Sequence, residues 1–151
     1  MSLPSYLSKK GYQKKKMNLT KTNHFKITAK INGVKGKFIV DTGASNTCID
    51  TTLVEHFKLI SENSDTKAAG AGATGMETQL AKNNSVKIGS WKSKNNSVVV
   101  FDLSHVNDAL TTHGSKPVHG IIGADILKKG AAVIDYKDNL LFLKQSKKAL
   151  K

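Results

Sequence analysis

The stretch that decides the fold is FIVDTGAS, residues 38–45. Three apolar residues typical of a buried strand lead directly into Asp41, a carboxylate that is costly to bury unless a neighbour satisfies it or a reaction uses it. Thr42 supplies a hydroxyl that can hold the loop, and Gly43 lets backbone approach the carboxylate closely. Asp-Thr-Gly is also ordinary turn chemistry. The triplet alone therefore leaves open both a structural turn and a reactive carboxylate.

The residues around this stretch predict short strands. Apolar and polar residues alternate from Phe25 to Ile31, the period of a half-buried strand. Asn32-Gly33 tolerates positive φ and predicts a tight hairpin turn, after which the chain returns as a strand to Asp41. Beyond the stretch, residues 47–49 predict another strand. We expect Thr51 or Thr52 to cap a brief helix over 53–57.

The second half of the chain continues the pattern. Alternation resumes from Val86 to Trp91, and residues 98–101 predict a fully apolar strand. Residues 104–115 fit a helical turn within a loop. The remaining expected elements are a strand over 118–122, a helix over 125–129 ended by Gly130, and strands over 131–136 and 140–143. Many short strands without βαβ alternation predict a mostly-β, barrel-like domain.

Composition limits the alternatives. The 151 residues fit one domain, with a net charge of +13 concentrated in the first 37 and last eight residues. We expect a basic, flexible N-terminal arm over 1–22, a folded domain over 23–145 and a basic tail over 146–151. No apolar run is long enough for a membrane span, and no secretory signal is evident. The single cysteine, Cys48, allows no intrachain disulfide. We expect a cytoplasmic protein with no membrane partner.

A second motif, GIIGADIL at residues 120–127, follows about 80 residues later, with a Gly-rich segment between the two. In this order and spacing, the three features resemble retropepsin-like aspartic peptidases, the single-domain, retroviral type, over residues 24–143. The resemblance implies a closed, mostly-β acid-protease fold with one short C-terminal helix, equivalent to half of a pepsin-like bilobal enzyme. It also implies a flap over residues 69–76.

The resemblance assigns roles to individual residues. Asp41 would be the catalytic carboxylate, Thr42 would hydrogen-bond across a dimer axis, and Gly43 would contact the substrate backbone. The chain departs from the retroviral pattern at Ser45-Asn46, where those enzymes usually carry Asp after the Ala. The substrate-binding residues implied are Ala44, Ser45, Ala69, Gly70, Ala71, Gly72, Ile121 and Ile122.

The mechanism that the resemblance implies needs two carboxylates, but the sequence has one Asp-Thr-Gly triplet. A homodimer would bring two copies of Asp41 together on a twofold axis. Such a pair shares one proton and can activate water for peptide-bond hydrolysis. The implied function is an aspartic endopeptidase acting on a peptide or protein substrate, with no metal or organic cofactor. Its activity should be bell-shaped in pH and favour mildly acidic conditions.

Two other functions fit parts of the sequence. The first is a non-catalytic dimeric module of the same fold that binds peptides or proteins. The second is a nucleic-acid-associated protein that uses the Lys-rich N-terminal arm, because clustered Lys neutralises phosphates. Lys runs at chain ends are more often solvated tails, and these runs lack the interleaved aromatics that stack on bases.

Four further signals receive structural interpretations. The G-x-G-x-x-G pattern at 70–75 lacks the preceding strand and following helix of a dinucleotide site. The five histidines fit no zinc-site spacing. Cys48 lies in an apolar stretch and is interpreted as a core residue. Asp125 is expected in the first turn of its helix, where the helix dipole favours a negative charge.

Overall fold

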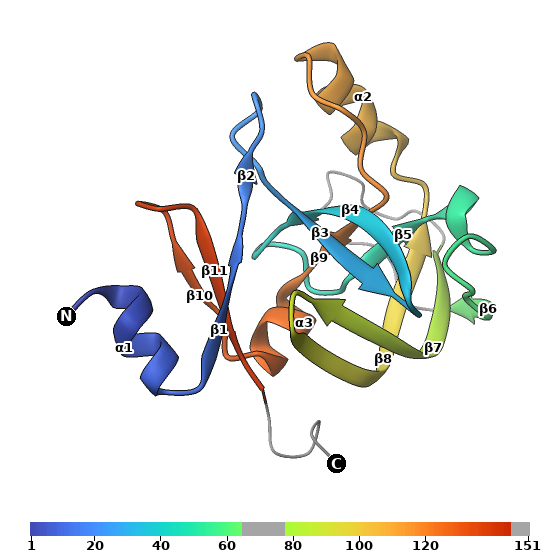
Figure 1. Ribbon diagram of the computed structural model, residues 1–151. Coiled ribbons are helices and arrows are strands. Elements are labelled where there is room, and N and C mark those ends of the chain that lie inside the picture. The colour runs from blue at the N-terminus through green and yellow to red at the C-terminus, as the bar shows by residue number, and fades with distance from the viewer. Residues whose placement is uncertain (65–77, 146–151) are drawn as a thin grey trace.

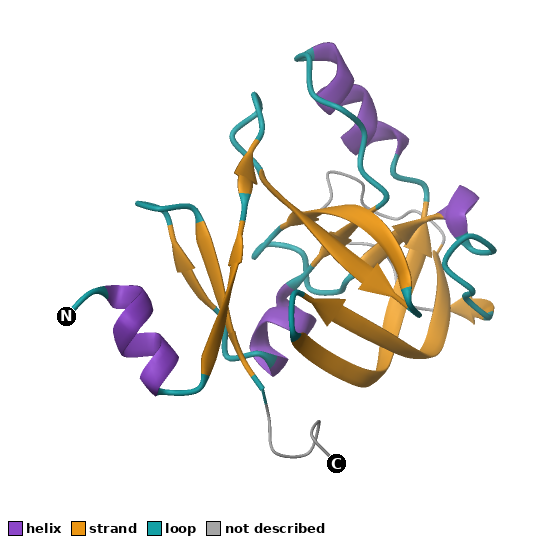
Figure 2. Ribbon diagram, viewed as in Figure 1, coloured by secondary structure: helices purple, strands orange, loops and turns teal. Residues whose placement is uncertain are grey.

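The structure is a computed structural model that describes residues 1–64 and 78–145. The expected flap over 69–76, with Ala69, Gly70, Ala71 and Gly72, lies outside the described residues, as does the G-x-G-x-x-G pattern. The basic tail expected over 146–151 lies outside them too. Figures 1 and 2 show a strand-rich body with helix α2 projecting from one end and helix α1 beside the N-terminus.

Six strands close into a barrel in which each is paired with the next (Figure 2). Around the barrel they are β3 (Phe25–Ile31), β4 (Val34–Val40), β9 (Gly120–Ile122), β5 (Cys48–Asp50), β8 (Trp91–Phe101) and β7 (Thr78–Ile88). Pairing of β7 with β3, Val86 opposite Ile31, closes the ring. Two short strands extend the sheet: β6 (Ser61–Ser64) beside β7 and β2 (Asn18–Leu19) beside β3. The predicted closed, mostly-β fold is confirmed.

The alternation seen in the sequence places one face of β3 in the core, whereas all of β9 is buried. Ile27, Ile31 and Phe38 are at most 1% exposed, as is Ile49 from β5. Burying an aliphatic or aromatic side chain of this kind stabilises the fold by about 1.5–3 kcal/mol. The hairpin turn also forms as predicted, since Asn32 and Gly33 have φ of 52° and 80°.

The helices are short. The helical turn expected within 104–115 is α2 (Ser104–Thr112), and α3 (Ala124–Lys129) ends at Gly130 as predicted. The expected helix over 53–57 is wrong: the chain instead makes a 3₁₀ turn over Thr51–Leu53. Its cap is Asp50, whose carboxylate accepts the Thr52 N–H at 3.1 Å. In the described parts of the chain, no helix has the length and hydrophobicity required to cross a membrane.

The N-terminal residues differ from the flexible arm expected over 1–22. They form α1 (Leu3–Lys9) and β1 (Tyr12–Lys16), which Figure 1 shows at one side of the barrel. Strand β1 pairs with β11 (Leu140–Lys144), which pairs in turn with β10 (Val133–Asp135). Met17, next in the chain, is 1% exposed. Backbone pairing does not depend on side-chain polarity, so the Lys-rich sequence concealed a strand anchored by Met17.

Candidate active site

The Asp41 loop begins where β4 ends. The Asp41 N–H donates to the Ile122 carbonyl at 3.0 Å, which extends the β4–β9 pairing by one residue. The Gly43 N–H donates to Asp41 Oδ1 at 2.9 Å. The Ala44 N–H donates to the Asp41 carbonyl at 3.2 Å. These bonds close the loop on itself and hold the carboxylate half-buried, while Thr42 and Gly43 are exposed.

Strand β9 passes behind this loop at very close range. A Cβ on Gly120 would lie 2.3 Å from the Cys48 carbonyl oxygen. A Cβ on Gly123 would lie 2.8 Å from the carbonyl oxygens of Ala44 and Asn46. Such contacts exclude any side chain, which explains why glycine stands at both ends of GIIG. The close approach is secured by the Ala124 N–H, which donates to the Ala44 carbonyl at 2.7 Å.

Asp125 fixes the far side of the loop through Thr47. Both Asp125 carboxylate oxygens accept the Thr47 N–H at 3.0 Å, and Oδ1 also accepts the Thr47 hydroxyl at 2.8 Å. The Thr47 hydroxyl oxygen in turn accepts the Gly123 N–H at 3.1 Å. Thr47 is fully buried. Asp125 lies in the first turn of α3 as predicted, but nothing in the sequence indicated its partnership with Thr47, 78 residues away.

The site residues predicted around Asp41 fall into two groups. Ser45 is exposed beside the loop, like Thr42 and Gly43. Ala44, Ile121 and Ile122 are 1%, 2% and 0% exposed, so their side chains support the loop from within the core. The structure brings both groups to one end of the barrel, at the junction of β4, β9 and α3.

Three other aspartates, which lack a following Thr-Gly or Ser-Gly, are engaged locally. Asp50 accepts the Leu103 N–H at 2.8 Å, in addition to its cap on Thr52. Asp102 accepts the Ser104 N–H at 2.8 Å, and hydrogen bonding by the Ser104 side chain and then by its backbone lowers the pKa of the Asp102 carboxyl. Asp135 accepts the Lys137 N–H at 2.9 Å. By contrast, Asp41 Oδ2 has no protein partner among residues 1–64 and 78–145.

Cys48 lies near Asp41 and Asp125, and its surroundings do not lower its pKa as an activated nucleophile would require. Burial, together with the charges of Asp125 and Asp41, raises the pKa of its thiol to about 12. The thiol is therefore protonated at neutral pH, and it donates to the Asn46 carbonyl at 3.1 Å. This agrees with its interpretation as a core residue.

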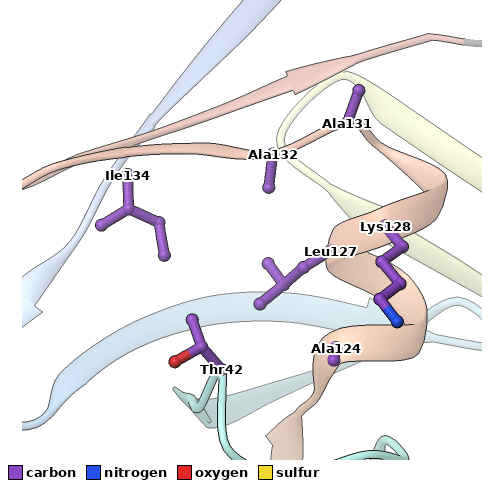
Figure 3. A pocket seen from close by; sticks show the side chains of 7 residues that line it. All are labelled: Thr42, Ala124, Leu127, Lys128, Ala131, Ala132 and Ile134. Carbon is purple, nitrogen blue, oxygen red and sulfur yellow. The ribbon is translucent and has the colours of Figure 1, made fainter.

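A hollow of about 400 Å³ lies beside Thr42, between α3 and β10 (Figure 3). Thr42, Leu127 and Ile134 line it together, and the lining is mainly apolar. Strand β10 stands at the edge of its three-stranded sheet. The exposed Thr42 is thus adjacent to an apolar surface and to a strand edge. Within residues 1–64 and 78–145, no three His, Cys, Asp or Glu side chains lie close enough together to hold a metal ion.

The site thus consists of a fixed, half-exposed carboxylate that is followed by Thr-Gly and supported by a glycine-flanked strand. The sequence around this site matches a known family. The profile of the aspartyl protease family covers residues 27–126, most of the chain. The chain belongs to this family. No curated protein sequence matches it significantly.

Solved structures show that this aspartyl protease family member has a retropepsin-like fold. It is similar to a retropepsin-like aspartic protease from Rickettsia conorii, with 23% identity, a TM-score of 0.61 and coverage of 89% of this chain and 91% of the other. For the retroviral protease-like domain of Ddi1 from Leishmania major, the values are 19%, 0.55, 83% and 90%. For the EIAV protease, solved with the inhibitor HBY-793, they are 22%, 0.54, 73% and 90%.

Proposed function

We propose that this protein is an aspartic endopeptidase whose active form is a homodimer. Two copies of Asp41 hold a water molecule between them and hydrolyse peptide bonds of a peptide or protein substrate. Support for activity comes from membership of the aspartyl protease family, over a matched region that includes the Asp41 loop.

The observation that carries this proposal is that the Asp41 carboxylate is held in a fixed position and is still accessible. It is held in place through Oδ1 by the Gly43 N–H at 2.9 Å, while it remains half-exposed. The backbone therefore orients the carboxylate without using all of its hydrogen-bonding capacity. Because Asp50, Asp102 and Asp125 accept bonds from their own surroundings, the second carboxylate would come from another copy of the chain.

The surface around Thr42 is suited to receive that second copy. A twofold axis beside Thr42 would place the two Asp41 loops together and would bury the apolar hollow between α3 and β10. It would also bring the edges of two β10 strands close to each other. In this arrangement the Thr42 hydroxyls hydrogen-bond across the axis, and Gly43 and Ser45 face the substrate.

The chemistry follows from two carboxylates in contact. Like charges at this distance cannot both ionise at low cost, so the pair holds one proton. The ionised carboxylate takes a proton from water, and the protonated one polarises the carbonyl of the bond to be cut. Activity therefore requires the singly protonated pair and falls at both ends of the pH range.

The test is cleavage of a mixed peptide library at mildly acidic and neutral pH, read by mass spectrometry. Wild type is compared with Asp41→Asn and with Asp138→Asn, a matched change at an exposed hairpin residue. We expect wild type and Asp138→Asn to cut at the same sites and Asp41→Asn to lose activity while remaining folded. Equal cleavage by all three would refute the assignment. Peptide binding without cleavage by any of them would identify a non-catalytic binding module.

A further inference from the structure

A row of lysines crosses the outer face of the barrel. Lys92 of β8 lies opposite Lys87 of β7, and Lys87 lies opposite Lys30 of β3. Lys30 in turn lies opposite Lys35 of β4. All four are exposed. Since neighbouring strands lie about 4.8 Å apart, the row spans roughly 14 Å.

The positive charges of this row are not balanced by nearby carboxylates among the residues that line the adjacent hollow. Like charges directly opposite each other on paired strands destabilise a sheet. A hollow of about 220 Å³ beside the row is lined by Lys15, Lys30, Lys35 and Lys87, together with Thr28, Ala29 and Gly89, none of which carries a carboxylate. Within the described residues, the ion pair of the chain is Lys82–Glu62, outside this lining. The folded protein thus maintains a repulsive arrangement that an external anion would relieve.

The positive charge continues along β3 and β4 beyond Lys30 and Lys35. Lys37, two residues after Lys35, donates from Nζ to the Thr28 hydroxyl at 2.6 Å. Lys26, on the same face of β3, has a pKa lowered by burial and by the charges of Lys37 and Lys116. The cationic surface is therefore longer than the hollow and follows the direction of the strands.

We propose that the lysine face, defined as Lys15, Lys30, Lys35, Lys87 and Lys92, binds the phosphate backbone of a double-stranded nucleic acid without reading its bases. Phosphates are the anions whose regular, dense spacing matches a row of uncompensated ammonium groups. The face contains lysine only, and lysine acts on phosphate as a compact point charge without the planar fork of arginine.

The composition of the face disfavours other anionic partners. The exposed large hydrophobic side chains of the described residues are Met1, Leu3, Tyr6, Leu19, Ile60 and Tyr136, and none belongs to β3, β4, β7 or β8. The face therefore has no apolar centre for a protein interface and no side chain to insert into a lipid surface. Trp91, the aromatic residue next to Lys92, is 2% exposed and cannot stack on the bases of a single strand.

The lysine face is separate from the candidate active site. Lys35 is near the start of β4 and Asp41 follows its end, so at about 3.3 Å per residue their backbones are roughly 20 Å apart. Binding there would leave the Asp41 loop free. The nucleic-acid alternative drawn from the sequence relied on the N-terminal arm, whereas this proposal relies on the barrel, with Lys15 as the contribution of β1.

The test compares two triple variants with equal charge. The face variant carries Lys30→Gln, Lys35→Gln and Lys87→Gln, and the control carries Lys9→Gln, Lys10→Gln and Lys14→Gln; each lowers the net charge from +13 by three, to +10. Binding to a labelled DNA duplex and to an RNA duplex, each of about 20 base pairs, is measured by fluorescence anisotropy between about 50 and 200 mM salt.

We expect wild type to bind both duplexes with a steep salt dependence. In the face variant, the slope of log K against log salt should fall by about 3, with affinity at least tenfold lower near 100 mM salt. The control should keep its slope and stay within about threefold of wild type. An equal loss in the control would show that diffuse charge, not this face, is responsible, and would overturn the proposal, as would the absence of wild-type binding at low salt.

Two further measurements keep the outcome interpretable. Vesicles rich in phosphatidylserine and polyglutamate serve as competitors at matched charge; if either displaces the duplex more effectively than unlabelled duplex does, the nucleic-acid assignment fails. Thermal melting checks folding, and the face variant should melt at or above wild type because repulsion between paired lysines is relieved. If the triple variant does not fold, Lys30→Gln alone should lower the slope by about 1.

Discussion

Thr47 connects the parts of the molecule that hold Asp41 in place. It is fully buried, its hydroxyl donates to Asp125 Oδ1 at 2.8 Å, and the same oxygen accepts the Gly123 N–H at 3.1 Å. One hydroxyl thus joins the segment after the Asp41 loop, the end of β9 and the first turn of α3. A hydrogen bond to a carboxylate of this kind contributes about 1.5–3 kcal/mol.

Replacing this hydroxyl by a methyl group tests its contribution. Thr47→Val keeps the shape of the side chain but leaves one Asp125 bond and the Gly123 N–H without a partner. We expect the free energy of unfolding in urea to fall by about 2–4 kcal/mol. Peptidase activity should fall further than the loss of folded protein explains, because the Asp41 loop loses its support. Thr112→Val, at an exposed position of α2, should stay within about 0.5 kcal/mol of wild type. Similar values for both variants would contradict the role given to Thr47.

At the residue scale, the sequence predicted what is local and missed what is not. The sequence places Asp41 at the end of an apolar strand, and the family resemblance assigns its role, while Asp125 is predicted in the first turn of a helix. The bond between Asp125 and Thr47 joins residues 78 apart. Neither residue type indicates a partner by itself, since a Thr beside Cys48 and Ile49 fits an ordinary strand. Only the threading of β9 brings the two together.

At the scale of elements, β9 is the strand on which the site depends. It pairs in parallel with β4 and antiparallel with β5. Gly120→Ala would place a Cβ 2.3 Å from the Cys48 carbonyl, so one of these pairings must move. We expect a loss of about 1–3 kcal/mol or more in unfolding free energy, measured by urea titration, together with lost peptidase activity.

Gly43→Ala provides the contrast for this prediction. Its Cβ would lie 3.3 Å from Asp41 Oδ1, a side-chain atom, and no backbone clash arises. We expect stability close to wild type with activity reduced through crowding of the carboxylate. Comparable destabilisation by both substitutions would show that the close approach of β9 is not what requires glycine.

The β4–β9 pair also carries a pH-sensitive contact. His119 Nδ1 accepts the Lys37 N–H at 2.9 Å, and the His119 N–H donates to the Lys37 carbonyl at 2.8 Å. Burial lowers the pKa of His119, as do His56, whose ring centroid lies 6.2 Å away, and Lys37. The folded state therefore favours neutral His119. As pH falls through about 6.5, the unfolded chain takes up this proton first, so stability decreases on acidification and levels off once the folded form is also protonated.

We expect His119→Asn to remove this part of the pH dependence. Unfolding free energies are compared from pH 5 to pH 8 in wild type, His119→Asn and His113→Asn, a matched change at an exposed position. The slope of stability with pH should flatten in His119→Asn alone. An unchanged slope in that variant would remove His119 as the cause. The His119–Lys37 contact matters for function because the proposed Asp41 chemistry favours mildly acidic pH, and at that pH the contact is weakened.

Elements were predictable where side chains alternate and unpredictable where the backbone alone decides. The hairpin of β3 and β4 followed from alternation and from Asn32-Gly33. Strand β1 did not, because its sequence, YQKKK, has no apolar period and pairs with β11 through the main chain. The 3₁₀ turn at Thr51–Leu53 differs from the expected helix over 53–57 because Asp50, rather than Thr51 or Thr52, supplies the cap.

At the scale of the whole molecule, the fold separates two chemically different surfaces. The Asp41 end is apolar beside Thr42, whereas the lysine face lies across β3, β4, β7 and β8, with Lys15 from β1. A net charge of +13 favours anionic partners, and the sequence alone directs attention to the Lys-rich N-terminal arm rather than to the barrel. The location of the lysine face came from strand register, which places lysines opposite one another although they are far apart in sequence. A dimer formed at the Thr42 surface would leave both lysine faces available.

The proposed dimer makes activity depend on protein concentration. Ile134 lies on β10 at the sheet edge and lines the hollow beside Thr42. If a second copy covers this hollow, Ile134→Glu buries an unpaired charge at the interface and should weaken dimerisation by two to three orders of magnitude. Ile60→Glu is the matched control, because Ile60 is 86% exposed and lies outside this surface.

Sedimentation equilibrium should then find Ile134→Glu monomeric and Ile60→Glu dimeric at the same concentration. Specific activity should fall on dilution for wild type and Ile60→Glu and should be absent in Ile134→Glu, whose folding is checked by thermal melting because Ile134 also packs against the core. Full activity in a monomeric Ile134→Glu protein would mean that one chain completes the site, and the second carboxylate would then have to be sought within the chain itself.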